Sequence, residues 1–202
     1  MEIICLDLEG VLIPEIWIGV AEKTGIEALK ATTREVPEYN TLMQQRLRIM
    51  NENDLGLPII QEVIDSLNPL EGAREFLDKL REDFQVVILS DTFYEFAKPF
   101  MRKLGWPTLF CHHLETNMDG KIINYHLRMK DHKFMAVKAF HQLKYRVYAA
   151  GDSYNDTSML RESDRGILFM APQNVIAEYP QFPSVTTYVE LRAKFDKFSS
   201  NL

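Results

Sequence analysis

The stretch Ile3-Ile4-Cys5-Leu6-Asp7-Leu8-Glu9-Gly10-Val11 places two carboxylates at the end of an apolar run. A continuous apolar run of this length is typical of a strand that is buried on both faces, as in a parallel sheet. Two later runs end in the same manner, 86–89 in Ser90-Asp91-Thr92 and 147–150 in Gly151-Asp152-Ser153-Tyr154-Asn155-Asp156. Polar groups at the carboxyl ends of neighbouring parallel strands converge on one crevice. The three segments therefore predict one shared pocket.

Strand and helix patterns alternate along the rest of the chain. This alternation predicts an α/β fold with a doubly wound, Rossmann-like parallel sheet. Strands are expected at 3–7, 85–90, 108–112, 146–150, 166–169 and 184–187, and a β-hairpin at 114–128 with Asp119-Gly120 at its turn. Helices are expected at 72–82, 93–103, 132–143, 154–163, 173–179 and 188–197, and Asp131 is expected to cap the third of them.

The segment between the first two strands is different. It is helical in pattern over roughly 55 residues, which is too long for a simple crossover. Pro14 can open a first helix toward Lys23, an apolar stripe covers 39–54, and Pro58 can open another helix. We expect residues 14–69 to form an inserted helical cap over the strand ends. Residues 1–13 and 70–202 would then form the α/β core domain.

Composition excludes several classes of protein. The 202 residues carry a formal net charge of −6, so no basic surplus is available to bind a nucleic-acid backbone. No run approaches the roughly 18 apolar residues of a membrane span, and the sequence begins directly with the first strand. Both cysteines, Cys5 and Cys111, lie in apolar runs and are expected to be buried free thiols. A cytoplasmic location is expected.

The residue types at the strand ends suit phosphoryl transfer. An aspartate can attack phosphorus and form an aspartyl-phosphate, and the rest of the reaction needs charge neutralisation and alignment. Mg²⁺ prefers carboxylate and carbonyl oxygens. Asp7, Asp152 and the main-chain carbonyl of Glu9 could supply them.

Other side chains near these motifs can complete such a site. Ser90 and nearby backbone N–H groups can hold phosphate, although Ser90 could instead cap the next helix. Lys133, in the first turn of its helix, can reach in as a point charge, with Lys130 as its rival. Glu9 has the spacing of a general acid and base. Asp156 could hold Lys133 or a metal-bound water.

These motifs carry a family resemblance. Asp-x-Glu-Gly-Val, Ser-Asp-Thr, a lysine and Gly-Asp-Ser-x-Asn-Asp occur in an order that resembles the haloacid-dehalogenase superfamily of phosphotransferases. Within it, the chain is most similar to the phosphoserine phosphatases, and above all to bifunctional bacterial ones that also pass phosphate to homoserine. The likeness covers nearly the whole chain, including Pro-Glu-Ile-Trp-Ile at 14–18 and Leu-Ser-Asp-Thr-Phe-Tyr-Glu-Phe at 89–96.

The resemblance assigns a role to each matching position. It implies Asp7 as the nucleophile, Glu9 as the acid and base, and Mg²⁺ held by Asp7, the Glu9 main chain and Asp152. Phosphate would contact Ser90, the Asp91 backbone and Lys133. In the cap, the family pairs a glutamate and an arginine with the ammonium and carboxylate of an amino acid. Glu15 and Arg46 stand at these places, and Asn155 matches a polar residue of the substrate site.

Glu9 departs from most of the superfamily, which has aspartate at this position. The extra methylene places the carboxyl differently over the leaving oxygen. Either the acid–base chemistry is retuned, for instance toward an alcohol acceptor, or hydrolysis is slow. The bifunctional members share this glutamate, which favours the first interpretation.

Structural interpretations compete at several of these positions. Glu15 and Arg46 could be an ordinary surface pair, and Arg48 rivals Arg46. The pair His112-His113 has no partner pair at metal-binding spacing and is interpreted as structural. The aromatic residues of the last helix could pack on the core or on a second subunit, so a homodimer is possible.

The sequence thus predicts an enzyme that takes phosphate from O-phospho-L-serine and delivers it to water or to L-homoserine, with small molecules as its partners. One alternative is a phosphatase for another small phosphomonoester. Another is a non-catalytic protein that binds phosphorylated amino acids.

Overall fold

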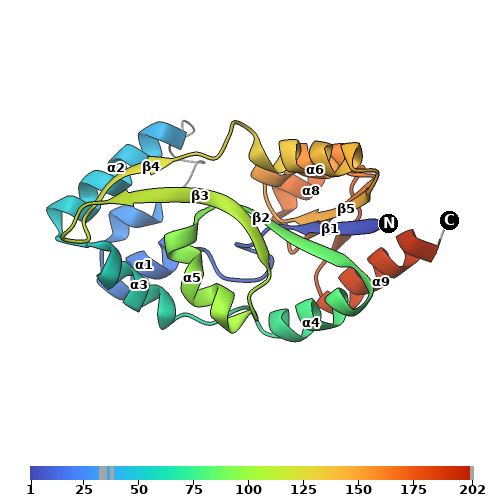
Figure 1. Ribbon diagram of the computed structural model, residues 1–202, viewed down its shortest axis with the longest axis horizontal. Coiled ribbons are helices and arrows are strands. Elements are labelled where there is room, and N and C mark those ends of the chain that lie inside the picture. The colour runs from blue at the N-terminus through green and yellow to red at the C-terminus, as the bar shows by residue number, and fades with distance from the viewer. Residues whose placement is uncertain (32–35, 37–38, 201–202) are drawn as a thin grey trace.

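A central sheet organises the molecule. In the computed structural model, which describes residues 1–31, 36 and 39–200, the described strands form a seven-stranded sheet in the order β4-β3-β2-β1-β5-β6-β7 (Figure 1). The strands are β1 (Glu2–Leu6), β2 (Gln85–Phe93), β3 (Thr108–Thr116), β4 (Ile122–His126), β5 (Arg146–Gly151), β6 (Arg165–Phe169) and β7 (Ser184–Val185). These strands pair in parallel except for β3 with β4, so the expected α/β fold is confirmed.

Helices cover both faces of the sheet, and the alternation of side chains along β1 shows why both faces are apolar. Ile4 and Leu6 belong to the same buried cluster as residues of α4 (Ala73–Asp83), α5 (Tyr94–Lys103) and α9 (Tyr188–Ser200). Ile3 and Cys5 face the opposite side, toward α6 (His132–Gln142), α7 (Thr157–Glu162) and α8 (Gln173–Glu178). In Figure 1, α4 and α9 lie on one side of β1 and β5, and α6 and α8 on the other.

The strand β2 is longer than the sequence pattern predicted. It continues from Gln85 to Phe93, and its register with β3 shifts between Leu89 and Phe93. Within this irregularity Ser90 Oγ accepts a hydrogen bond of 3.2 Å from the Thr92 N–H, so Ser90 does not cap the following helix. Similarly, β3 is one continuous strand: its first half pairs with β2 and its second half forms the expected hairpin with β4.

Two helix starts differ from expectation. The first helix, α1 (Ile16–Thr24), begins after Pro14, because the Glu9 carboxylate accepts the Ile16 N–H at 2.9 Å and sets the first turn there. Asp131 stands at the start of α6, but its side chain does not cap the helix. Its backbone is left-handed, with φ of 49°, and its carboxylate accepts a 2.8 Å hydrogen bond from Ser158 Oγ instead.

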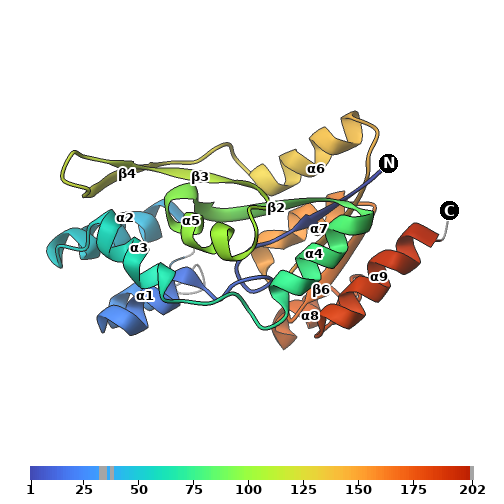
Figure 2. The ribbon, with the colours of Figure 1, turned by 60° about the horizontal axis from the view of Figure 1, so that its bottom comes forward.

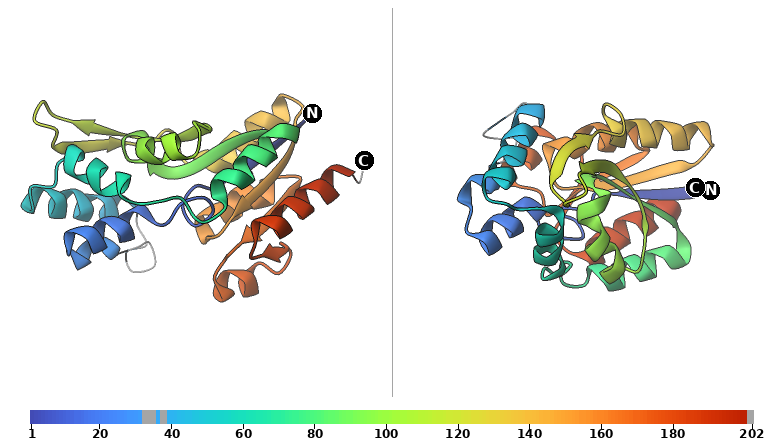
Figure 3. Two further views of the ribbon diagram at one scale, coloured as in Figure 1. Left: turned by 90° about the horizontal axis from the view of Figure 1, so that it is seen from below. Right: turned by 60° about the vertical axis from the view of Figure 1, so that its left-hand side comes forward.

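The segment between β1 and β2 is helical, as expected. Its described part contains α1, a 3-10 turn η1 (Glu27–Lys30), α2 (Tyr39–Glu52) and α3 (Leu57–Asp65), followed by α4, which packs on the sheet. Its two ends lie together, because the Leu70 N–H donates a 3.0 Å hydrogen bond to the Leu12 carbonyl. These helices and the β3–β4 hairpin extend from the same end of the sheet, away from the termini (Figures 2 and 3). The ring of Trp17 on α1 packs edge-on against Phe96 on α5, with centroids 5.4 Å apart.

The C-terminal helix packs on the core. Phe195 of α9 is fully buried, and Tyr188 stacks on Phe76 with ring centroids 4.8 Å apart. Cys5 and Cys111 are buried free thiols, as expected. Among the described residues, no helix combines the length and the apolar character that crossing a membrane requires.

Candidate active site

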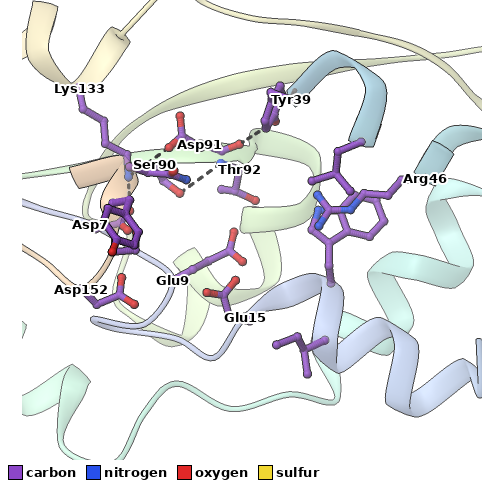
Figure 4. Close-up of a pocket in the computed structure, with 16 residues that line it drawn as sticks. Asp7, Glu9, Glu15, Tyr39, Arg46, Ser90, Asp91, Thr92, Lys133 and Asp152 are labelled. Atoms are coloured by element: carbon purple, nitrogen blue, oxygen red, sulfur yellow. Dashed lines mark hydrogen bonds and ion pairs between the residues drawn. The ribbon is translucent and has the colours of Figure 1, made fainter. Parts of the chain in front are cut away.

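A cavity of about 270 Å³ lies at the carboxyl ends of β1, β2 and β5, and α1 and α2 complete its walls (Figure 4). Its size is near the lower end of small-molecule sites, about 300 Å³. Every site residue that the sequence predicted lines it, except Asp156: Asp7, Glu9, Glu15, Arg46, Ser90, Asp91, Lys133, Asp152 and Asn155. The ends of β1, β2 and β5, together with residues at the start of α1, on α2 and on α6, therefore bring the predicted residues into one space.

Lys133 lies at the centre of the acidic end of the cavity. Its Nζ is 2.8 Å from Asp156 Oδ1, 2.9 Å from Asp7 Oδ1 and 3.3 Å from Asp91 Oδ2. Burial alone would lower the pKa of Lys133, but the three carboxylates raise it well above its usual value. The ammonium is therefore permanently charged. The rival residue, Lys130, is exposed.

Asp156 lies beneath the cavity and is completely buried. Its Oδ2 accepts the N–H groups of Asp152 at 3.0 Å and Ser153 at 3.1 Å, while Oδ1 pairs with Lys133. A Cβ on Gly151 would come within 2.3 Å of Asp156 Cγ, so the carboxylate approaches the strand end only because that residue is glycine. Asp156 thus ties Lys133 to the turn that carries Asp152.

Asp7 and Asp152 leave a negative charge that Lys133 does not fully balance. Side-chain oxygens of Asp7, Asp152 and Asp156 all lie within 4.8 Å of one another. Burial and the nearby Asp156 raise the pKa of Asp152 to about 7, and the same two causes raise the pKa of Asp7. Gly10, at φ of 75°, brings the loop so close that a Cβ there would lie 2.5 Å from Asp152 Cγ. Clustered hard oxygens of this kind fit a divalent cation such as Mg²⁺.

Glu9 and Glu15 form a second acidic pair on the cavity wall (Figure 4). Burial and the Glu15 carboxylate raise the pKa of Glu9 to about 8, although the hydrogen bond from the Ile16 N–H acts in the opposite direction. A carboxyl group with this pKa is protonated at neutral pH and can give up its proton there, which is what a general acid requires. Glu15 is more exposed than Glu9.

Arg46 is buried at the opposite end of the cavity, so it is not part of a solvated surface pair. Its Nη2 donates to the Ala31 carbonyl at 2.9 Å, and its Cζ lies 4.5 Å from the centre of the Trp17 ring. Its Nε has no hydrogen-bond partner among the described residues. A buried guanidinium with a free donor is suited to bind a carboxylate. Arg48, the rival, is exposed and pairs with Glu52 at 3.8 Å.

The sequence did not indicate several other residues of the cavity. Trp17, Tyr39, Leu42 and Thr92 also line it. Tyr39 and Leu42 precede Arg46 by seven and four positions, so the face of α2 that carries Arg46 could have identified them. The side chain of Tyr39 reaches the end of β2, where its hydroxyl donates a 3.4 Å hydrogen bond to the Asp91 carbonyl.

The two neighbouring histidines of the sequence separate in the structure. His113 is exposed, with its Nδ1 3.3 Å from Glu95 Oε1. His112 is buried and lies beside His132 of α6, with ring centroids 4.5 Å apart, and both face Asp91. The sequence interpretation weighed His112 only with its neighbour, because the sheet that brings α6 to the end of β3 is not visible in a local pattern.

Comparison with known proteins agrees with this geometry. Residues 1–164 match the family model of the haloacid dehalogenase-like hydrolases. The chain is 65% identical over 200 residues to a protein of Pseudomonas aeruginosa named phosphoserine phosphatase ThrH, which covers 99% of this chain and 98% of that protein. It is 63% identical over 200 residues to a phosphoserine phosphatase of Pseudomonas syringae pv. tomato, covering 99% and 84%.

Solved structures show the same fold at lower identity. A substrate-bound phosphoserine phosphatase complex superposes with a TM-score of 0.75 at 18% identity, over 96% of this chain and 97% of that one. A phospho-aspartyl intermediate analogue of phosphoserine phosphatase gives 0.74 at 20% identity, over 92% of both chains. From the family match, the two close relatives and the shared fold, we conclude that the chain belongs to the haloacid dehalogenase-like hydrolases.

Proposed function

We propose that this chain is a Mg²⁺-dependent phosphoserine phosphatase that works through an aspartyl-phosphate on Asp7 and can also pass phosphate to L-homoserine. One observation carries the proposal: the same cavity holds an acidic cluster with Lys133 at one end and the buried Arg46 at the other. A phosphorylated amino acid presents a phosphate and a carboxylate in the same way. The names of the two close relatives support the choice of phosphoserine.

Recognition of the amino acid falls to the helical insert. We assign residues 14–69 to a cap and residues 1–13 with 70–202 to the core, in line with the hydrogen bond that joins the ends of the insert at Leu12 and Leu70. Arg46 binds the substrate carboxylate and Glu15 its ammonium group. Asn155, which is exposed at the cavity wall, adds a polar contact.

The phosphate end is built by the core. Ser90 Oγ, the Asp91 N–H and Lys133 hold the phosphate oxygens, and Asp7, the Glu9 carbonyl and Asp152 are the oxygens that would hold Mg²⁺. The bound ion supplies charge neutralisation on phosphate oxygens that would otherwise repel the Asp7 carboxylate.

Asp7 attacks phosphorus in the first step. Its Oδ1 is held by the Leu8 N–H at 2.7 Å and by Lys133, so the other oxygen is the one we assign to the attack. As the new bond between phosphorus and Asp7 forms, the bond from phosphorus to the seryl oxygen breaks. Glu9, protonated at neutral pH, gives its proton to that oxygen, and serine leaves.

The second step reverses these roles. The Glu9 carboxylate takes a proton from water or from the homoserine hydroxyl, whose oxygen attacks phosphorus while the bond to Asp7 breaks. The products are inorganic phosphate or O-phosphohomoserine, and the Asp7 carboxylate is restored. Homoserine is one methylene longer than serine, a difference worth only about 1–3 kcal/mol in most pockets, so one clamp of Arg46 and Glu15 can serve both.

A ³¹P NMR experiment tests the proposal. The protein is incubated with Mg²⁺ and O-phospho-L-serine, with and without L-homoserine. Release of inorganic phosphate establishes the phosphatase, and a phosphohomoserine resonance that requires homoserine establishes the transferase. A third sample contains phosphoethanolamine in place of phosphoserine. If phosphoserine persists in the first two samples while phosphoethanolamine is hydrolysed in the third, the enzyme acts on a different phosphomonoester. Binding of phosphoserine without any turnover would favour a non-catalytic binding protein.

A further inference from the structure

Asp91 is the meeting point of four elements around the phosphate end of the cavity. Its Oδ1 lies 3.2 Å from His132 Nε2 and 3.7 Å from His112 Nε2, and its Oδ2 lies 3.3 Å from Lys133 Nζ. Its carbonyl is 3.4 Å from the Tyr39 hydroxyl. Residues of β3 and α6 thus face the Asp91 carboxylate, while Tyr39 of α2 contacts the backbone carbonyl of the same residue. The function proposed above uses only the backbone of this residue.

A metal site is the first interpretation to consider, because one ligand atom each from Asp91, His112 and His132 lie within 4.8 Å of one another. The hydrogen bonding argues against it. The Arg128 N–H donates to His112 Nδ1 at 3.1 Å, so Nδ1 carries the lone pair of the neutral ring and Nε2 carries the proton. Histidines that bind a metal through one nitrogen donate a proton from the other. His112 therefore presents a donor to Asp91.

His132 presents a donor as well. Its ring is buried, and its Nδ1 has no hydrogen-bond partner among the described residues. Placing the single proton of the neutral ring on Nε2 gives it an acceptor, Asp91 Oδ1, whereas a proton on Nδ1 would face none. His132 thus donates to Asp91 Oδ1 at 3.2 Å, while the Nε2–H of His112 lies 3.7 Å from the same oxygen, too far for a hydrogen bond. The hydrogen bond from His132 fixes the carboxylate, and the nearby N–H dipole of His112 helps to stabilise its charge.

All three N–H donors of the Lys133 ammonium group are occupied. Its ammonium has three protons and lies against three carboxylates, Asp156, Asp7 and Asp91. To donate to an incoming phosphate, it must release one of them. The contact with Asp91 is the longest, and the Asp91 side chain is 35% exposed, against 8% for Asp7 and none for Asp156. Of these three carboxylates, only Asp91 keeps an imidazole donor, His132, after the release.

We propose that Asp91, fixed by its hydrogen bond from His132, is a releasable anchor for Lys133. It holds the ammonium group in place when no phosphate is bound and gives it up when phosphate arrives. His132 is the positioning residue: it holds the carboxylate in a fixed position beside the incoming anion, and together with the nearby N–H of His112 it reduces the repulsion of that anion. This inference rests on the proposed function, because it assigns Lys133 to the phosphate.

Without the His132 donor, Asp91 would hold Lys133 more tightly and repel the anion more strongly. We therefore expect His132→Leu to weaken binding of inorganic phosphate, measured by calorimetry in the presence of Mg²⁺, by about tenfold. His132→Gln, whose amide N–H can replace Nε2–H, should recover most of the loss. In an Asp91→Asn background, His132→Leu should change the affinity by less than about twofold. His113→Leu, at the exposed neighbouring histidine, is the matched control and should bind phosphate like the wild type.

The same affinities can overturn the inference. A purely structural role of His132 predicts the same loss of affinity in both backgrounds, and wild-type affinity in His132→Leu would likewise refute the anchor. A crystal structure of the wild type with Mg²⁺ and phosphate gives a second test that needs no variant. Lys133 should contact phosphate and Asp156 and lie beyond the ion-pair limit of about 4 Å from Asp91. Retention of Asp91 with release of Asp156 would contradict the proposal.

Failure of the proposed function gives a different pattern. If phosphoserine is not hydrolysed but phosphate binds with the predicted dependence on His132, the function fails and the anchor stands. If the wild type hydrolyses phosphoserine and the double-mutant cycle shows no coupling, only the anchor fails. A wild type that neither hydrolyses phosphoserine nor binds phosphate overturns both.

Discussion

The ammonium group of Lys133 lies 2.8 Å from Oδ1 of Asp156, a carboxylate with no exposed surface. This pair connects the first turn of α6 to the turn after β5, and it lies beneath the acidic end of the cavity. Its contribution to the stability of the fold is tested by removing one of the two partners. Breaking a buried pair by removing one partner leaves an uncompensated charge, which costs several kcal/mol.

Replacement of Lys133 should therefore destabilise the fold as well as the site. We expect Lys133→Met to lower the free energy of unfolding by about 3–5 kcal/mol, measured by urea denaturation. Without the ammonium, the buried carboxylates resist ionisation and their pKa values rise in the folded state, so the loss should be larger in mildly alkaline than in mildly acidic buffer. Lys130→Met, at an exposed position, should stay within about 0.5 kcal/mol of the wild type. Equal effects of the two substitutions would contradict the interpretation.

The proposed role of Asp7 as the nucleophile can be tested without disturbing the shape of the site. Asp7→Asn keeps the size of the side chain but removes the attacking carboxylate, so the rate of phosphoserine hydrolysis should fall by at least ~10³-fold. Phosphoserine should still bind, because Arg46, Glu15 and Lys133 are unchanged. The measurement is phosphate release together with calorimetric binding. Hydrolysis at a wild-type rate would remove Asp7 from the mechanism.

Arg46 should distinguish substrates by their carboxylate. We expect Arg46→Ala to raise the KM for phosphoserine by roughly 10–100-fold, since a charge-assisted contact at a buried site is lost. The same substitution should change the KM for phosphoethanolamine, which has no carboxylate, much less. Steady-state kinetics on both substrates, with Arg48→Ala as the exposed control, provides the comparison. A similar loss on both substrates would mean that Arg46 acts through the packing on Trp17 instead.

The pKa of Glu9, about 8, predicts a pH profile. As general acid in the first step, Glu9 must be protonated, so kcat/KM should fall as the pH rises above this value. Glu15→Gln removes the negative charge that helps to raise the pKa of Glu9, and the fall should then begin at lower pH. Glu22→Gln, on the exposed side of α1, is the control and should leave the profile unchanged. An identical profile in Glu15→Gln would show that the two carboxylates are not coupled.

Proton binding should compete with Mg²⁺. Because burial and Asp156 raise the pKa of Asp152 to about 7, this proposed ligand is protonated in acidic buffer before the ion binds. The apparent dissociation constant for Mg²⁺ should rise by about tenfold for each pH unit below that value, as expected for release of one proton. Calorimetry in buffers of different ionisation enthalpy measures both the affinity and the proton count. Affinity that does not change with pH would exclude Asp152 as a ligand.

Much of this arrangement follows from local sequence patterns. The apolar runs before Asp7, Ser90 and Asp152 predicted parallel strands, and parallel strands must present the residues that follow them at one edge. This is why the predicted residues at the strand ends line one cavity although they are far apart in the sequence; Glu15, Arg46 and Lys133 reach it from the start of α1, from α2 and from α6. The length of the segment between the first two strands predicts an inserted cap over residues 14–69, and this division into two domains stays a prediction.

Other features depend on contacts between distant segments. The start of α1 is set by Glu9, seven residues earlier, and not by the proline that local preference indicated. Asp131 bonds to Ser158 on a different helix, so its capping preference has no effect. The grouping of His112 and His132 on Asp91 needs β2, β3 and α6 to be in place. Single-sequence patterns contain none of these tertiary contacts.

The hydrogen bond between the Leu70 N–H and the Leu12 carbonyl has a consequence for how this protein can diversify. The chain leaves the α/β core and returns to it at adjacent points, so the segment between them can be exchanged without altering strand order. The residues that we assign to phosphate chemistry, Glu9 included, lie on the core side of this junction, whereas Glu15 and Arg46 lie in the exchangeable segment. Substrate range can therefore evolve independently of reaction chemistry, provided that a new segment also covers Phe96 on α5.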